Sequence, residues 1–525
     1  MMRRSLQLTL LFILTLTAIQ SGMAQGYNTI NANNIYTGMH SIGTMFWDLD
    51  DSTFFVPYNG SNSPTAIFAG GLWMSGLTSE GELKLVAQEY TREFIAGPIN
   101  ADFIDFDFDK VWKVTASEIN ELMNDFSNDG IVDTRPSENL LNWPGVGNQM
   151  YTDQLYSGQF FAPFHDQNND NNYNPYEGDY PVVNLNGCEI IPDELLYSLY
   201  HTHREDQPIM EVHSILYAYN SAEDSIINNS LFLQQKILNL EEELLDCNIA
   251  FWVDFDIGCH DNDYAGCEPS RNTIIAYNAT EKDDERLSCD ENTLFYDDTP
   301  IVSYTFLNKP LSKYTTFDTY SGHPSTREQR LNYLEGRWLD GTPFTEGGTG
   351  YNPMSTDTVD FLFPGNPSDD SEWSMRSERV SLGDKVSLAN TKIGNLFPKE
   401  IFTLDAVINY TNEPGYLTEF DQSMENVDHL QSLYDNCFTH SLDTELPYST
   451  PPLKLYPNPT RDYIQLKSDH QFQSYKIVNV AGQVVHEGDA DDLAEGMELD
   501  LATGIYTILF SAKHASAQTR LVIIE

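Results

Sequence analysis

Residues 247–258 read CNIAFWVDFDIG, and the alternation of their side chains predicts the fold class of the chain. One alternating set is apolar (Cys247, Ile249, Phe251, Val253, Phe255 and Ile257), and the other is Asn248, Ala250, Trp252, Asp254 and Asp256. A period of two residues is that of a β-strand, whose successive side chains point to opposite faces. The stretch therefore predicts a strand with its apolar set on one face and both aspartates on the other.

Most of the remaining chain also has the pattern of strands, which are separated by turns rich in Gly, Asn, Asp and Pro. Helical periodicity is scarce, and the best amphipathic segments are ASEINELMNDF at 116–126 and EFDQSMENVDHLQSLYDN at 419–436. We therefore expect a mainly β fold, with a multi-domain β-sandwich architecture and a few short helices.

The composition is that of a strongly acidic globular protein. The 525 residues are 40% hydrophobic and 12% aromatic, and 28 Lys and Arg stand against 79 Asp and Glu, giving a formal net charge of -51. Nucleic acid and anionic membrane surfaces are poor partners for such a chain, because their phosphates would be repelled. The charge is compatible with solubility alone or with neutralisation by divalent cations.

Residues 1–24 have the pattern of a secretory signal peptide. Arg3 and Arg4 precede the apolar run LQLTLLFILTLTAI, and small residues ending at Ala24 offer a cleavage site. The apolar run is too short for a membrane-spanning helix. We expect the mature chain to begin at Gln25 and to contain no transmembrane segment.

Six cysteines, an even number in an exported chain, indicate disulfides. They are Cys188, Cys247, Cys259, Cys267, Cys289 and Cys437. Six cysteines allow fifteen pairings, among which the sequence does not decide. Cys259 and Cys267 flank a short acidic loop and form the most natural local pair, with scattered buried thiols as the alternative.

Composition also suggests where the chain divides. We expect a β-rich region at 25–180, a second β-rich domain at 181–440, a linker at 441–452 and a C-terminal domain at 453–525. The linker has the sequence SLDTELPYSTPP, which is rich in Ser, Thr and Pro and has no periodicity. The strand series after it is long enough for a small Ig-like sandwich of seven strands.

The C-terminal region carries four motifs that together resemble one known domain. LYPNPTRDYIQL, YKIVNVAGQVV, LATGIYTILF and the terminal RLVIIE resemble the type A C-terminal sorting domain of the type IX secretion system. The matching positions are Tyr456, Pro457, Asn458, Pro459, Gly482, Gly504, Ile505 and Tyr506. The chain departs from the pattern at its end, which is VIIE where the family often has a basic residue.

This resemblance implies a Bacteroidota-type origin and an export route. The chain would enter the periplasm through its signal peptide and cross the outer membrane by means of the type IX secretion machinery, its partner through residues 453–525. It would then be cleaved and either released or attached to surface lipopolysaccharide, so we expect a secreted or outer cell-surface location. The preceding region is similar to large tagged surface proteins without an assigned activity, in segments such as IFAGGLWMSG and GRWLDGTPFTEGGTGYN.

An acidic stretch at 165–179, HDQNNDNNYNPYEGD, has the spacing of a calcium loop. Positions 1, 3, 5, 7 and 12 of such a loop are Asp166, Asn168, Asp170, Asn172 and Glu177. Position 6 is Asn171, and Asn tolerates the left-handed conformation that this turn requires. No flanking helices are evident, so we expect a calcium loop within β structure, or alternatively a solvated turn rich in Asn and Asp.

A second acidic group follows the opening stretch and consists of Asp254, Asp256, Asp261 and Asp263. The first two would share a strand face about 7 Å apart, and the other two follow at once in a loop. Converging carboxylates repel one another unless protons or a cation compensate, and calcium needs only oxygen ligands. These four residues therefore form a candidate second calcium site, with ordinary surface carboxylates as the alternative.

Catalytic motifs are not evident in the sequence. His201, His203 and His213 do not have the spacing of a zinc signature, and His213 fits an ordinary strand position. Acidic pairs for sugar hydrolysis are too easily found among 79 carboxylates to carry weight. Some tryptophans would stack on glycans if exposed, although such residues more often lie in a core: Trp73, Trp143, Trp338 and Trp373.

The sequence thus favours a calcium-stabilised, non-enzymatic surface or secreted protein that acts as an adhesin or binds glycans. The second interpretation is a surface hydrolase acting on polysaccharide.

Overall fold

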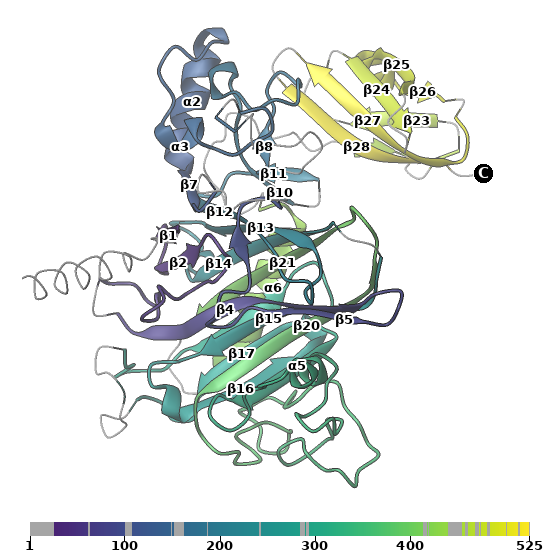
Figure 1. The fold of residues 1–525 in the computed structure, drawn as a ribbon. Coiled ribbons are helices and arrows are strands. Elements are labelled where there is room, and N and C mark those ends of the chain that lie inside the picture. The colour runs from purple at the N-terminus through teal and green to yellow at the C-terminus, as the bar shows by residue number, and fades with distance from the viewer. Residues whose placement is uncertain are drawn as a thin grey trace, which may run out of the picture. The chain divides into compact units, whose positions relative to one another are not determined.

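The structure is a computed structural model (Figure 1). It describes residues 26–523 except 61–62, 100–107, 149, 152–161, 186, 241–242, 284–288, 290–292, 413–416, 418, 439–453, 457–459, 462, 468–471, 473, 480–483, 500 and 513–514. The predicted signal peptide (1–24) and linker (441–452) lie outside the described residues. The chain divides into two compact units, Met1–Ser441 and Leu442–Glu525.

The first unit contains an antiparallel sheet of nine strands. Its order is β16-β17-β18-β21-β14-β13-β12-β6, and β7 also pairs with β12. The strands are β6 (Ile95–Ala96), β7 (Trp112–Thr115), β12 (Glu194–His201), β13 (Met210–Ala218), β14 (Ser230–Asn239), β16 (Asp263–Glu268), β17 (Thr273–Asn278), β18 (Ile301–Phe306) and β21 (Ile401–Thr411).

A second antiparallel sheet has six strands in the order β19-β20-β15-β4-β3, with β5 paired to β4. They are β3 (Phe54–Phe55), β4 (Thr65–Leu77), β5 (Leu83–Ala87), β15 (Leu244–Phe255), β19 (Lys313–Asp318) and β20 (Lys385–Leu396). In the described part of the unit there are also three two-stranded ribbons: β1 (Tyr27–Ile30) with β2 (Thr37–His40), β8 (Phe164–His165) with β9 (Tyr180–Pro181), and β10 (Val183–Leu185) with β11 (Cys188–Ile190).

One hydrophobic core joins the two large sheets, as the prediction of a β-sandwich requires. Phe251 of β15 stacks on Tyr304 of β18, with ring centroids 4.5 Å apart and an angle of 2° between the rings. The predicted apolar face of β15 therefore points into the sandwich. The opposite face is also buried, because Tyr90 packs edge-on against Trp252 with ring centroids 5.1 Å apart.

Sheet pairing crosses the expected division at residue 180. β4, from the first region, pairs with β15, and both β6 and β7 pair with β12. The ranges 25–180 and 181–440 therefore contribute strands to the same two sheets.

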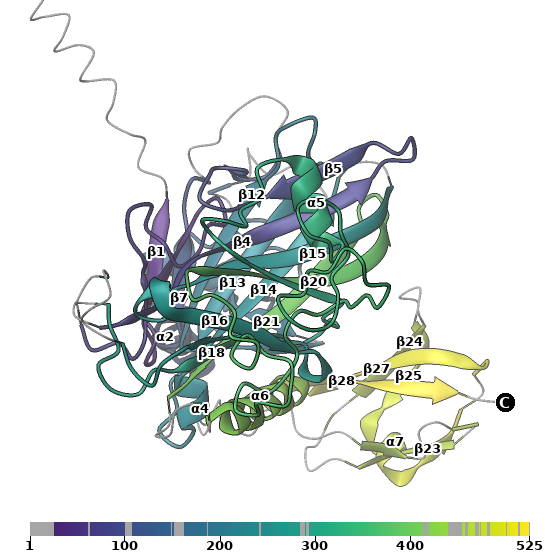
Figure 2. The ribbon, with the colours of Figure 1, turned by 90° about the horizontal axis from the view of Figure 1, so that it is seen from below.

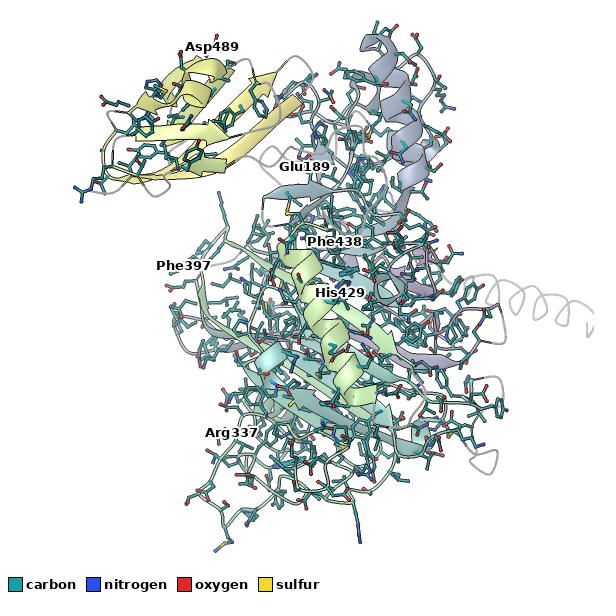
Figure 3. The ribbon with its side chains drawn as sticks, turned by 180° about the vertical axis from the view of Figure 1, so that it is seen from behind. Glu189, Arg337, Phe397, His429, Phe438 and Asp489 are labelled. Atoms are coloured by element: carbon teal, nitrogen blue, oxygen red, sulfur yellow. A yellow bond between two sulfur atoms is a disulfide. The ribbon has the colours of Figure 1, made fainter. Side chains whose placement is uncertain are left out.

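Both predicted amphipathic helices are present. α2 (Ala116–Asp129) begins with a capping box between Thr115 and Glu118 and ends at Gly130, whose φ of 84° is left-handed. α6 (Glu419–Asp435) runs along the outer face of the nine-stranded sheet, as Figure 3 shows near His429. Its Tyr434 hydroxyl donates a 2.6 Å hydrogen bond to Oδ2 of Asp405 in β21.

The remaining helical turns among the described residues of this unit are short. They are α3 (Glu138–Leu141), α4 (Ser225–Asn228) and α5 (Arg327–Leu334), with 3₁₀ turns η1 (Pro175–Glu177), η2 (His260–Asn262) and η3 (Pro269–Arg271). α4 lies beside α6, as Figure 2 shows, and His429 Nε2 is 2.8 Å from Oδ2 of Asp224, the cap of α4.

Two disulfides are formed, Cys188–Cys437 and Cys259–Cys289. The expected local pair of Cys259 with Cys267 is wrong. Cys267 lies on β16 and is directed into the core, where its thiol donates a 3.4 Å hydrogen bond to the Leu362 carbonyl. Cys247 on β15 is likewise a buried free thiol.

The second unit has seven strands among its described residues, as predicted. They form a sheet of order β22-β23-β26 and a sheet of order β25-β24-β27-β28, with one common core. Its elements are β22 (Lys454–Tyr456), β23 (Tyr463–Lys467), β24 (Ser474–Asn479), β25 (Val484–Asp489), α7 (Ala490–Glu495), β26 (Met497–Glu498), β27 (Gly504–Ala512) and β28 (Ala515–Ile523). Within the described part of the chain, no helix has the length and apolar character needed to span a bilayer.

Candidate metal centres

The predicted calcium loop follows β8 and is shaped by two left-handed asparagines. Asn169 and Asn171 have φ values of 61° and 60°, so Asn171 adopts the conformation expected at position 6. Oδ2 of Asp166 accepts a 2.7 Å hydrogen bond from the Asn171 amide. The chain thus curls back over Asp166 as a cation loop requires.

Other predicted ligands of this loop contact one another. Nδ2 of Asn168 donates to Oε2 of Glu177 over 2.6 Å and to Oδ2 of Asp170 over 3.3 Å. Asn172 instead donates from its side chain to the Asp170 carbonyl. Position 7 of a calcium loop supplies its backbone carbonyl, so the side chain of Asn172 is not needed as a ligand. The carboxylates of Asp166, Asp170 and Glu177 do not all come within 4.8 Å of one another, so a bound ion would have to draw them inward.

Asp179 is a residue of this loop that the sequence analysis did not assign. It is fully buried, and its two oxygens accept hydrogen bonds from the amides of Gln167 (2.9 Å) and Asn174 (2.8 Å). Burial raises the pKa of Asp179 to about 6, against the lowering effect of these two hydrogen bonds. Asp179 therefore ties the start of the loop to its end.

The loop rests on a buried aromatic base. Tyr173 is buried, contacts the ring of Phe164 with centroids 5.3 Å apart, and donates to the Leu140 carbonyl over 2.7 Å. Gly147 has a φ of 84°, and a Cβ there would meet Oδ1 of Asn172 at 2.6 Å. The segment NWPGVGN thus packs against the loop.

The second candidate centre lies where β15 ends and β20 begins. One oxygen from each of Asp254, Asp256 and Asp384 lies within 4.8 Å of the others. Asp384 is far along the chain, but β20 pairs with β15 so that Lys385 is opposite Phe255. The strand pairing thus adds a third carboxylate to the two that the sequence placed together.

Two of the oxygens in this centre are buried without a partner. Asp254 is 3% exposed, and its Oδ2 accepts a 2.5 Å hydrogen bond from the Tyr90 hydroxyl, while no donor group among the described residues bonds to Oδ1, whose neighbour is the Asp384 carboxyl. Oδ1 of Asp256 is also buried and unpartnered there. Asp384 is 9% exposed, and its Oδ1 accepts a 2.7 Å hydrogen bond from the Thr319 hydroxyl.

The electrostatics of the centre favour an added positive charge. Burial, followed by the charges of neighbouring carboxylates, raises the pKa of both Asp254 and Asp256 well above the usual range. The nearby ammonium of Lys385 is directed to Asp318, with Nζ 3.4 Å from its Oδ2. Three converging carboxylates with orphaned oxygens fit a hard divalent cation such as calcium, which binds oxygen ligands.

The other two residues expected at this site lie outside the group of three. Asp263 is fully buried, and its Oδ2 accepts a 3.1 Å hydrogen bond from the Ile257 amide. Asp261 is exposed, 3.5 Å from His260, and close to the Cys259–Cys289 disulfide. Both charges act on Asp256, because they contribute to its raised pKa.

The three histidines considered for zinc do not form a metal cluster among the described residues. His201 Nδ1 lies 2.8 Å from the Gly97 carbonyl oxygen. His213 lies on β13, and its Nδ1 is 2.7 Å from the hydroxyl of Tyr197 on β12. His203 is exposed. His213 is thus the strand residue that its pattern predicted.

Comparison with known families identifies the class of this protein through its second unit. Residues 454–525 match the family model described as the secretion system C-terminal sorting domain. The chain is therefore a protein with a type IX sorting domain, exported to the cell surface or secreted, and this domain implies interaction with the type IX secretion machinery. No curated protein matches the chain.

Solved structures resemble the chain only remotely. A polysaccharide lyase has a TM-score of 0.19 and 9% identity, covering 62% of this chain and 35% of its own. A putative aldose 1-epimerase from Escherichia coli K12 has a TM-score of 0.21 and 9% identity, and the match covers 74% of this chain and 100% of the epimerase. A putative kojibiose phosphorylase from human microbiome has a TM-score of 0.21 and 10% identity, and the match covers 58% of this chain and 37% of the phosphorylase. The chain spans about a third of the lyase, and none of these scores establishes a shared fold.

Proposed function

We propose that this exported protein is a calcium-stabilised, non-enzymatic adhesin that binds glycans at the cell surface or in the medium. The observation that carries the metal assignment is Oδ1 of Asp254, which is buried and unpartnered beside the carboxylates of Asp256 and Asp384. A buried polar atom without a partner costs free energy that a bound cation would recover. Attachment to surface lipopolysaccharide after cleavage of residues 453–525 would hold such an adhesin on its cell.

Calcium is the cation that best fits these ligands and this location. Both candidate centres offer oxygen atoms and no thiolate or imidazole, which favours calcium over zinc. Extracellular calcium modules bind with dissociation constants of about 10⁻⁴–10⁻³ M, so they fill only where calcium is abundant. A site at 100 times its dissociation constant would add roughly 2.7 kcal/mol to the free energy of unfolding.

The test is thermal unfolding of the purified chain in calcium and in excess chelator. We expect the melting temperature to rise with calcium, and calorimetric titration to detect binding. Asp384→Asn should remove the contribution of the second centre, and Asp170→Asn that of the loop. Asp357→Asn, an exposed carboxylate outside both centres, serves as the matched control. An identical melting temperature with and without chelator would refute calcium stabilisation.

A polysaccharide hydrolase is the second candidate function, and the same cluster is the observation that favours it. Carboxyl groups whose pKa is raised by burial can act as general acids in glycoside hydrolysis. However, one oxygen from each of Asp254, Asp256 and Asp384 lies within 4.8 Å of the others, which is closer than the roughly 5–5.5 Å or 6.5–9.5 Å between the two carboxyl groups of retaining and inverting glycosidases. Turnover of a polysaccharide that is lost in Asp256→Asn would favour the hydrolase, and binding without turnover would favour the adhesin.

A further inference from the structure

An exposed aromatic side chain lies in a turn that is hydrogen-bonded to the second candidate centre. Tyr320, in the turn between β19 and α5, is 78% exposed. Among the described residues nothing stacks on its ring or hydrogen-bonds to its hydroxyl. The tryptophans singled out in the sequence are different, because Trp73 and Trp143 are fully buried and Trp338 and Trp373 are partly covered.

The turn that carries Tyr320 is bound directly to a proposed metal ligand. Thr319, the preceding residue, donates from its amide to the Asp384 carbonyl (3.1 Å) and from its hydroxyl to Oδ1 of Asp384 (2.7 Å). The negative charge of Asp384 is the main cause that raises the pKa of the Tyr320 phenol, and the charges of Asp261 and Asp256 add to it. The turn that carries the ring thus lies against Asp384, and the charge of this carboxylate acts on the phenol.

The turn is also fixed internally. Oδ1 of Asp318 accepts hydrogen bonds of 3.1 Å from the amides of both Tyr320 and Ser321. Its Oδ2 pairs with Lys385, the neighbour of Asp384. The backbone of Tyr320 is therefore held in place although its side chain is in solvent.

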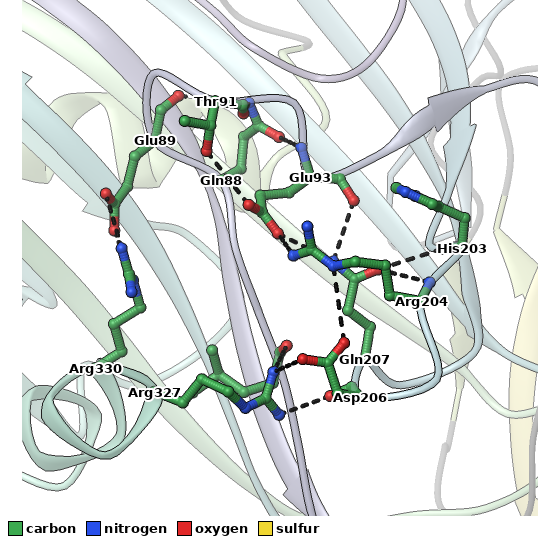
Figure 4. A network of polar contacts seen from close by, with 11 residues as sticks. Gln88, Glu89, Thr91, Glu93, His203, Arg204, Asp206, Gln207, Arg327 and Arg330 are labelled. Atoms are coloured by element: carbon green, nitrogen blue, oxygen red, sulfur yellow. Dashed lines mark hydrogen bonds and ion pairs between the residues drawn. The ribbon is translucent and has the colours of Figure 1, made fainter. Parts of the chain in front are cut away.

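α5 packs against this turn. Tyr333 of α5 stacks on Phe317 with ring centroids 4.7 Å apart and donates a 2.6 Å hydrogen bond to the Gly322 carbonyl. The helix itself is tied down by a polar network, shown in Figure 4, in which Arg327 contacts Asp206 (2.7 Å) and Arg330 contacts Glu89 (2.9 Å). These ion pairs tie α5 to the segments that follow β12 and β5.

We propose that Tyr320 and a calcium ion at Asp254, Asp256 and Asp384 form a binding site for neutral carbohydrate. The Tyr320 ring would stack on the apolar face of a pyranose, and two adjacent sugar hydroxyls would complete the coordination of the ion. Calcium takes 6–8 oxygen ligands, more than three carboxylates acting through one oxygen each supply. This inference rests on the metal centre of the proposed function.

The charge of the chain selects the class of glycan. A formal net charge of -51 repels uronic acid and sulfated polymers, whereas a neutral sugar is not repelled. Aromatic side chains offer a flat apolar surface to the carbon–hydrogen face of a sugar without requiring charge on it. We therefore expect neutral oligosaccharides to bind in preference to acidic ones.

The test is binding of the full chain to an array of neutral and acidic oligosaccharides, in calcium and in chelator. Wild type should bind neutral glycans in calcium and release them in chelator. Tyr320→Ala should weaken binding by up to about tenfold, and Tyr320→Phe, which keeps the ring, should retain it. Tyr351→Ala is the matched control, because Tyr351 is also an exposed tyrosine (46%) but pairs with Asp340.

Three results would count against a calcium-dependent sugar site at Tyr320. Absence of binding to every neutral glycan, binding that survives chelation, or full binding by Tyr320→Ala would overturn it. The melting temperature of the same samples separates this failure from that of the proposed metal centre. A calcium-dependent rise that persists in Tyr320→Ala leaves the metal centre intact, whereas its absence in wild type removes both.

Discussion

The hydroxyl of Tyr90 lies 2.5 Å from Oδ2 of Asp254 and donates a hydrogen bond to it. The Tyr90 ring also packs edge-on against Trp252, two residues earlier on β15. One side chain thus covers the aspartate face of the central strand and satisfies one oxygen of a carboxylate whose other oxygen is unpartnered among the described residues. The candidate metal centre thus has a protein donor on one side and carboxylate oxygens without a donor on the other.

Replacing Tyr90 with Phe should expose how far an ion satisfies this carboxylate. The variant keeps the ring but leaves Oδ2 of Asp254 without its donor, a loss of about 1–3 kcal/mol for a buried acceptor. In calcium the ion would compensate for part of this loss, so the decrease in the free energy of unfolding should be larger in chelator. Denaturant unfolding under both conditions measures the difference, and equal losses would argue against an ion at Asp254.

Asp179→Ala should disable the loop centre and leave the other centre unchanged. The variant removes the acceptor of the Gln167 and Asn174 amides, so the two ends of the loop lose their common anchor. We expect a loss of about 1–3 kcal/mol and one fewer calcium bound per chain. Calorimetric titration beside Asp384→Asn checks this, because the two variants should remove different binding events. An unchanged stoichiometry in Asp179→Ala would contradict the role of this residue.

Stability should fall on acidification through His40. Burial lowers the pKa of His40 from 6.5 to about 4, so between these values the unfolded chain binds a proton that the folded chain does not. The contribution of His40 to folding is therefore complete above pH 6.5 and decreases as the pH falls toward 4, by about 2 kcal/mol between pH 7 and pH 5. His40→Phe, which keeps a ring against Tyr27, should flatten this dependence in urea unfolding. A variant with the same pH dependence as wild type would show that other groups are responsible.

The disulfide pattern makes a chemical prediction. Peptide mapping should find Cys188 joined to Cys437 and Cys259 joined to Cys289. Cys247 and Cys267 are buried and unpaired, so iodoacetamide should label no thiol in the native chain and two after denaturation. A Cys259–Cys267 peptide, or labelling of the native protein, would contradict the structure.

Local pattern was sufficient for the parts of the fold that depend on neighbouring residues. The alternation at 247–258 predicted β15, and the carboxylates of Asp254 and Asp256 are neighbours because these residues lie two positions apart at the end of this strand. The amphipathic pattern at 116–126 likewise predicted α2, whose periodicity depends on residues three and four apart. Asn171 adopted the left-handed conformation because that preference belongs to the residue itself.

Features that depend on distant pairing were not predictable in this way. Asp384 has no local motif, and it joins Asp254 and Asp256 only because β20 pairs with β15. Cys289 reaches Cys259 from a separate loop, whereas the nearer Cys267 is turned into the core by the pleat of β16. Tyr320 was not singled out because exposure is a property of the assembled surface.

The position of Asp384 immediately before β20 sets the order in which the second centre can form. β20 inserts between β19 and β15, so the three carboxylates converge only after the late part of the unit has found its place in the six-stranded sheet. A calcium ion there would bind after the six-stranded sheet is complete. If the chain meets abundant calcium only after leaving the cell, the first unit would be less stable during export and more stable outside.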